Sequence, residues 1–192
     1  MRAFFVATVL LVPFASGATE LDAHLVRTTW GVPDFEDPHR WNSWMMELVS
    51  GPVRYAGIEA PTWQVCLGAP AFSSRGIEHG CNETRVALFG EALRSSGLFY
   101  VAQIHTCGVP IQSADVDDHV ASLAAAATIA KRLGARYVNV HDGVDFWSDD
   151  QVLAYFRGAL EIEAHVGIDM SHETHRTRAL ATPQTTLKVL AA

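Results

Sequence analysis

Residues 171–178 read SHETHRTR and place a carboxylate, two imidazoles and two guanidiniums in one short segment. A carboxylate such as Glu173 can bind a divalent cation or accept a proton from a substrate. A guanidinium stays charged, and its forked donors clamp phosphates or rows of hydroxyls. A salt bridge to a nearby acid is the alternative role of each arginine. We expect the clamp at Arg176 and the salt bridge at Arg178.

Three more polar residues stand at the ends of apolar segments, and each is of a type that binds metal or substrate. They are Glu59, His105 and His141. Each has a structural alternative, because a polar residue at a strand end often anchors a loop or caps a helix. Histidine nitrogen together with carboxylate oxygen suits zinc, manganese and related divalent metals. We therefore expect Glu173, His141 and His105 to be metal ligands if the fold brings them together.

Five segments rich in β-branched and aromatic residues alternate with stretches of helical periodicity. The expected strands fall within residues 24–31, 54–60, 98–106, 135–143 and 166–173. Helix starts are expected at Asp37, at Asp115 and at a capping box of Ser148 with Gln151, and helix ends at glycines 51, 97, 134 and 167. Parallel strands need a crossover helix, so this alternation predicts an α/β fold whose strands end at one common edge.

Residues 1–18 differ from the rest of the chain. Arg2 is followed by an uncharged run with small residues at 16 and 18, which is typical of a secretory signal peptide ahead of a domain at 19–192. The apolar centre of this run has about a dozen residues, short of the roughly 20 that span a bilayer. No stable membrane span is expected, and the predicted location is the secretory pathway or the extracellular space.

Charge and cysteine content narrow the partners further. Loss of the leader removes Arg2 and no acid, which changes the net charge from −7 to −8. Phosphate backbones repel such a charge, so a nucleic-acid partner is not expected. Three cysteines are too few for a disulfide scaffold, but a secreted chain can pair two of them. Cys66 with Cys81 is the expected pair, because both fall in one long loop region.

From about residue 24 onward, the chain resembles the xylose isomerase-like TIM-barrel superfamily, in particular its sugar phosphate isomerase/epimerase branch. The resemblance is carried by YAGIEA at 55–60, QIHT at 103–106, NVHDGVDFWS at 139–148 and SHETHRTR at 171–178. It implies a partial (β/α)8 TIM barrel of about five βα units with parallel strands. It also implies a small sugar or sugar phosphate as ligand and a divalent metal ion (Mn, Zn, Mg or Co) as cofactor.

The resemblance also implies a role for each candidate residue. Glu173 would bind the metal and move a proton next to a substrate carbonyl. His105 and His141 would bind the metal or a substrate oxygen. Glu59 and Arg176 would contact the substrate directly.

A complete barrel has eight βα units and typically about 250 residues, so the sequence predicts a C-terminally truncated barrel without ligands from its last three strands. Two functions stay open. One is a metal-dependent sugar (phosphate) isomerase or epimerase, with activity in doubt for this shortened form. The other is a secreted, non-catalytic carbohydrate-binding or interaction module. A second chain could supply the missing part, which leaves a homo-oligomer open.

Overall fold

The computed structural model describes residues 7–10, 24–67 and 81–192. The predicted leader, residues 1–18, lies outside the described residues except for 7–10. Within the described ranges, no helix combines the length and the apolar character needed to cross a bilayer.

One six-stranded sheet organises the chain, with its strands in sequence order. The strands are β1 (Ala7–Leu10), β2 (His24–Thr28), β3 (Gly57–Pro61), β4 (Phe99–His105), β5 (Ala135–His141) and β6 (Met170–His172). All pairs from β2 to β6 are parallel, which confirms the five predicted strands and the α/β class. The exception is β1, which pairs antiparallel with β2 and comes from the segment assigned to the leader.

Helices follow the strands in the order that parallel crossovers require. They are η1 (Pro33–Glu36), η2 (Pro38–Arg40), α1 (Trp41–Ser50), α2 (Thr62–Leu67), α3 (Glu83–Ser96), α4 (Val116–Arg132), α5 (Asp149–Val166) and α6 (Pro183–Ala191). The predicted caps at Asp115 and at Ser148 with Gln151 are confirmed, because their side chains accept backbone N–H groups of the first helical turn. Gly167 ends α5 in the left-handed conformation that glycine adopts without strain.

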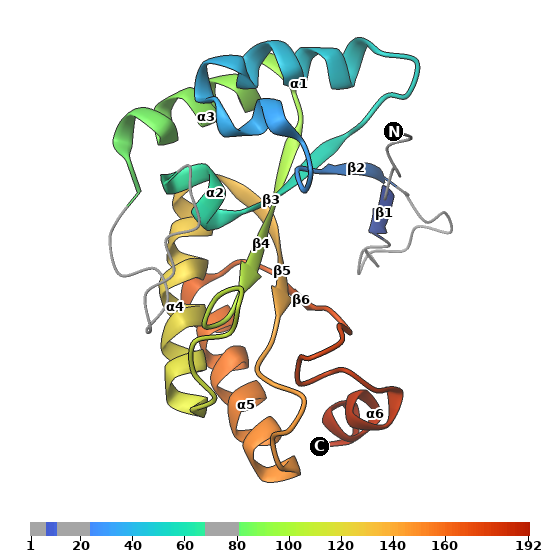
Figure 1. Cartoon of the computed structure of the whole chain (residues 1–192), viewed down its shortest axis with the longest axis vertical. Coiled ribbons are helices and arrows are strands. Elements are labelled where there is room, and N and C mark those ends of the chain that lie inside the picture. The colour runs from blue at the N-terminus through green and yellow to red at the C-terminus, as the bar shows by residue number, and fades with distance from the viewer. Residues whose placement is uncertain (1–6, 11–23, 68–80) are drawn as a thin grey trace.

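Two groups of helices pack on different parts of the sheet. Figure 1 shows α4 and α5 side by side along β4 and β5, with α1 and α3 together at the other end of the molecule. An aromatic cluster fills the space beneath α1 and α3, where the rings of Phe89 and Tyr100 lie 4.9 Å apart and both are fully buried. Burying such a ring contributes about 2 kcal/mol. This core packs against the amino-terminal end of β4, where Tyr100 lies. The aromatic cluster therefore does not occupy the carboxyl ends of the strands.

Strand register brings the predicted site residues to one edge. His105 pairs with His141 across β4 and β5, and Val140 pairs with His172 across β5 and β6. The disulfide between Cys66 and Cys81 confirms the predicted pair. It joins α2, which follows β3, to the residue just before the N-cap of α3.

Candidate functional site

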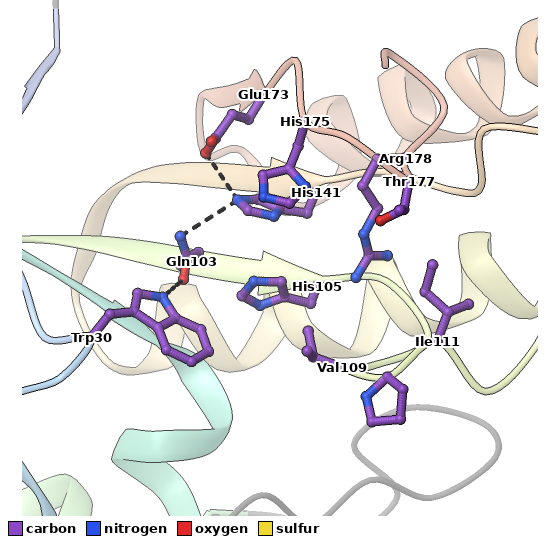
Figure 2. Close-up of a pocket in the computed structure, with 11 residues that line it drawn as sticks. Trp30, Gln103, His105, Val109, Ile111, His141, Glu173, His175, Thr177 and Arg178 are labelled. Carbon is purple, nitrogen blue, oxygen red and sulfur yellow. Dashed lines mark hydrogen bonds and ion pairs between the residues drawn. The ribbon is translucent and has the colours of Figure 1, made fainter. Parts of the chain in front are cut away.

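A cavity of about 530 Å³ opens at the carboxyl ends of β4, β5 and β6 (Figure 2). Of the predicted site residues, it brings together Glu173, His141 and His105. Trp30 and Gln103 line one part of it. The rest of its wall is formed by His175, Thr177, Arg178, Val109, Pro110 and Ile111. The two histidines and the carboxylate thus line one cavity, as the parallel sheet predicts.

Glu173 is held by two donors through a single oxygen. Its Oε2 lies 2.9 Å from Nε2 of His141 and accepts a 2.7 Å hydrogen bond from Nδ2 of Asn139. Within the described ranges, its other oxygen has no hydrogen-bond partner, and the side chain is 38% exposed. The hydrogen bond from His141 is the main cause that lowers the pKa of Glu173 to about 2. The carboxylate is therefore ionised at neutral pH and has one oxygen available to a ligand.

Glu59 lies beneath this pair and not in the cavity wall. It is 4% exposed, and its Oε1 accepts a 2.8 Å hydrogen bond from the same Asn139 amide that binds Glu173. Burial raises the pKa of Glu59. The amide group of Asn139 thus links a buried carboxyl to a half-exposed one. Direct contact of Glu59 with a substrate stays a prediction.

His105 faces the cavity as a neutral ring. Burial lowers its pKa to about 2, and its Nδ1 is buried without a hydrogen-bond partner among the described residues. The ring packs 4.4 Å from that of His141 and at a steep angle against Trp30. Trp30 is itself oriented, because its Nε1 donates to Oε1 of Gln103. Figure 2 shows these side chains converging from different elements on one side of the cavity.

The two arginines have different surroundings from those expected. Arg178 is buried, and its guanidinium donates to the backbone oxygens of Thr106 and Gly108 at 3.0 and 2.9 Å. The predicted salt bridge at Arg178 is therefore wrong, because carbonyl groups of the loop after β4 take both arms of the fork. Arg176 is exposed and outside the cavity lining. Its role as a substrate clamp stays a prediction.

A second histidine–carboxylate pair lies behind the cavity. Asp142 is fully buried, and its oxygens accept hydrogen bonds from the Tyr155 hydroxyl at 2.5 Å and from Nδ1 of His172 at 2.8 Å. Burial opposes the charged form of His172, but the hydrogen bond and the negative charge of Asp142 outweigh it and raise the pKa of His172. The backbone oxygen of Asp142 also binds the amide of Ala179, which joins the β5 end to the loop after β6. The sequence pattern did not predict this pair.

Thr106 connects the loops that surround the cavity. Its hydroxyl oxygen lies 2.7 Å from Nδ1 of the buried His119 and accepts the Gly143 amide at 3.0 Å. Nε2 of His119 lies 2.8 Å from the Ser113 carbonyl oxygen. Burial lowers the pKa of His119, so its ring is neutral. Gly143 has a positive φ of 53°, and a Cβ there would overlap the Trp147 ring, so this turn requires glycine.

The donors in the cavity fit part of a metal site. Nε2 of His141 and Oε2 of Glu173 converge on one point, and such a nitrogen and oxygen pair suits zinc or manganese. Across residues 7–10, 24–67 and 81–192, however, no three His, Cys, Asp or Glu side chains are grouped to hold an ion. The metal ion therefore stays a prediction, with His141 and Glu173 as the residues that would hold it.

Comparison with known proteins identifies the fold. No protein-family model and no curated protein sequence matches the chain. D-allulose 3-epimerase from Methylomonas sp. in complex with D-allulose is structurally similar, with a TM-score of 0.57 and 15% identity over 86% of this chain. A second structure of that epimerase, with additional C-terminal residues, gives a TM-score of 0.51 and 14% identity over 81% of this chain. Endonuclease IV from Thermus thermophilus has a TM-score of 0.48 and 18% identity over 86% of this chain.

The epimerase likeness shows that this chain has the α/β fold of part of a TIM barrel, as the sequence predicts. Membership in the xylose isomerase-like superfamily stays a prediction. The chain spans 57% of the length of the first of these epimerase structures and 54% of the second. Five parallel strands alternating with helices form a partial barrel, which confirms the predicted fold class.

Proposed function

We propose that this chain binds a small sugar in the cavity and that Glu173 moves a proton next to the sugar carbonyl, as an isomerase or epimerase does. The observation that carries the proposal is the half-exposed Glu173 carboxylate, fixed through one oxygen by His141 and Asn139. A group with one oxygen fixed and one available can take a proton from a carbon placed above it.

The protonation states of Glu173 and His105 agree with this role. Glu173 is ionised and can accept the proton, while His105 is neutral and can only exchange hydrogen bonds with a sugar hydroxyl. A bound sugar would exclude water from Glu173, which makes the carboxylate a stronger base than it is in the open cavity. Glu173 would then return the proton to the neighbouring carbon on the same face, which is isomerisation. Epimerisation would require a second proton donor on the opposite face of the carbon. A divalent ion on His141 and Glu173, when bound, would polarise the substrate carbonyl.

The structural comparison supports a sugar as the ligand class. The epimerase with the same fold holds D-allulose in its structure. Small sugars present vicinal hydroxyls, and the cavity offers them a carboxylate, imidazoles and the exposed face of Trp30. Sugar rings stack on such aromatic faces through their apolar C–H surface.

Metal content and sugar binding of the Glu173→Gln variant test the proposal. We expect wild-type protein to bind manganese or zinc and, with the metal present, to bind D-allulose in isothermal titration. Glu173→Gln should lower both affinities at least about tenfold, because the amide cannot replace the ionised oxygen. Glu91→Gln, a matched change at an exposed carboxylate on α3, should leave both unchanged. Metal binding that is the same in all three proteins would remove Glu173 from the site.

A secreted carbohydrate-binding module without catalysis is the second candidate. The indole of Trp30 is 46% exposed at the cavity rim, and stacking on it requires no metal ion. Sugar binding that is insensitive to metal and to Glu173→Gln would favour this candidate. Secretion is a separate element of the proposal, and protein recovered from culture medium with an amino terminus near residue 19 would support it.

A further inference from the structure

A second hollow of about 330 Å³ adjoins the cavity. It lies between the loop after β5, which contributes Asp145 and Phe146, and the loop before α4, which contributes Gln112. Ile111 and Thr177 line both hollows. Figure 2 shows these two residues at the end of the cavity opposite Trp30. The cavity therefore continues past Ile111 and Thr177 as a groove.

Phe146 is presented to solvent by a loop that is otherwise anchored. Its side chain is 72% exposed, although Val144 and Trp147 on either side of it are buried. Trp147 also donates from Nε1 to the Ala114 carbonyl at 2.7 Å, which ties the loop to the segment before α4. A large apolar ring on a fixed loop at the wall of a hollow is a surface on which a planar or sugar ring can stack.

The charges of the groove select the chemistry of its ligand. Among the residues that line the second hollow, Asp145 is the ionisable one, and it is exposed. The guanidinium of Arg178, which lines the adjoining cavity, donates its hydrogen bonds to the Thr106 and Gly108 carbonyls. Among the residues that line the second hollow, a phosphate would meet the Asp145 carboxylate and no cationic side chain. Hydroxyl groups, in contrast, would find acceptors on Asp145 and an amide on Gln112.

We propose that the ligand of this protein is a neutral carbohydrate longer than one sugar unit. Its reducing-end unit would lie at Glu173, and the next unit would pass Ile111 and Thr177 to stack on Phe146. This inference rests on the proposed sugar-binding function and narrows it from sugars and sugar phosphates to neutral oligosaccharides. The two exposed aromatic rings, Trp30 and Phe146, then stand at opposite ends of one binding groove.

Isothermal titration with trisaccharides and their monosaccharides tests the groove. We use cellotriose, maltotriose and xylotriose against D-glucose and D-xylose, with the full chain and manganese present. At least one trisaccharide should bind about tenfold more tightly than its monosaccharide. Phe146→Ala should remove most of that gain and leave monosaccharide affinity within about twofold. Leu160→Ala, which truncates another exposed apolar side chain, is the matched control and should change neither affinity.

The outcomes separate the groove from the proposed reaction. Trisaccharides that bind no more tightly than monosaccharides, or a Phe146→Ala loss that is equal for both, would overturn the groove alone if Glu173→Gln still weakens monosaccharide binding. A trisaccharide gain that depends on Phe146, together with monosaccharide affinity that Glu173→Gln leaves unchanged, would keep the groove and overturn the proposed role of Glu173. Absence of binding to every sugar tested would overturn both.

Discussion

Two histidine–carboxylate pairs lie at the ends of neighbouring strands, yet their surroundings differ. His141 and Glu173 are 2.9 Å apart, with the Glu173 side chain 38% exposed at the cavity. His172 and Asp142 are 2.8 Å apart, with the Asp142 side chain fully buried behind it. The same two functional groups at the same separation therefore occupy an open site in one pair and a closed one in the other.

From this difference we infer that hydrogen-bond saturation distinguishes a structural pair from the pair that the proposed function uses. Both side-chain oxygens of Asp142 are engaged, by Tyr155 and His172, so no position remains for a ligand. Glu173 keeps one oxygen without a partner among the described residues. A buried pair with all its partners fixes the loops, and a half-exposed pair with an open position can bind or react.

Asp142→Ala should have the largest effect on stability. It leaves the Tyr155 hydroxyl and the His172 ring without their partner and should lower the free energy of unfolding by about 3–5 kcal/mol. Urea denaturation followed by circular dichroism measures it. Asp145→Ala, an exposed acid in the same loop, should change stability by less than about 0.5 kcal/mol. A loss below about 1 kcal/mol for Asp142→Ala would mean that the buried pair is not a structural one.

Arg178→Met should have the next largest effect. The change strands two buried carbonyl oxygens and should cost about 2–3 kcal/mol of unfolding free energy. Arg178→Lys should recover less than half of that loss, because a single ammonium does not reproduce the fork that reaches Thr106 and Gly108. Arg176→Met, at the exposed arginine, is the control and should be neutral in the same denaturation assay. An equal loss for both arginines would contradict the assignment.

His172 should make a smaller contribution to the free energy of unfolding, and this contribution should depend on pH. Its folded pKa is raised above the ordinary 6.5, so its stabilising effect is complete below pH 6.5 and is lost as the pH rises through the folded pKa. The stability difference between wild type and His172→Gln should therefore shrink as the pH passes through the folded pKa. Thermal unfolding between about pH 6 and pH 9 follows it. His165→Gln, at an exposed histidine near the end of α5, is the matched control variant.

Glu173→Gln should have the smallest effect on stability. A partly exposed histidine–carboxylate hydrogen bond contributes less than about 1 kcal/mol. That contribution is present above pH 4.5 and is lost as the pH falls toward the folded pKa of about 2. The same variant should lose sugar and metal affinity, as described above. A Glu173→Gln protein that is strongly destabilised would show that this pair is structural like that of Asp142, and the contrast between the pairs would disappear.

Local signals made the fold predictable from the sequence. The capping box at Ser148 and the Asp115 cap lie within a few residues of the helices they start, so their physics is complete in a short window. Alternation of strands with these helices required parallel pairing, and parallel pairing gathered His105, His141 and Glu173 at one edge.

Long-range hydrogen bonds escaped prediction. Asn139 lies inside a strand, and only the register of β3, β5 and β6 shows that its amide meets both Glu59 and Glu173. The partners of Arg178 are backbone oxygens about 70 residues earlier in the chain, and a carbonyl has no sequence signature. The sequence did not predict strand β1, because its residues lie in the apolar run that is typical of a signal peptide. Hydrogen bonds between residues that are far apart in the sequence are therefore found only in the folded structure.

The hydroxyl of Thr106 belongs to a chain of hydrogen bonds behind the cavity in which each donor and acceptor is fixed. The neutral His119 ring faces the Ser113 carbonyl at Nε2, so its proton sits there and Nδ1 is an acceptor. The Thr106 hydroxyl donates to this Nδ1 at 2.7 Å and, over a longer 3.2 Å contact, to the His141 backbone oxygen. The oxygen of Thr106 is then left to accept the Gly143 amide. Donation runs one way, from the turn after β5 through a hydroxyl and an imidazole to the Ser113 carbonyl. Serine at position 106 could make the same hydrogen bonds. Valine has the shape of threonine but no hydroxyl, so it would leave the Gly143 amide and Nδ1 of His119 without a hydrogen-bond partner.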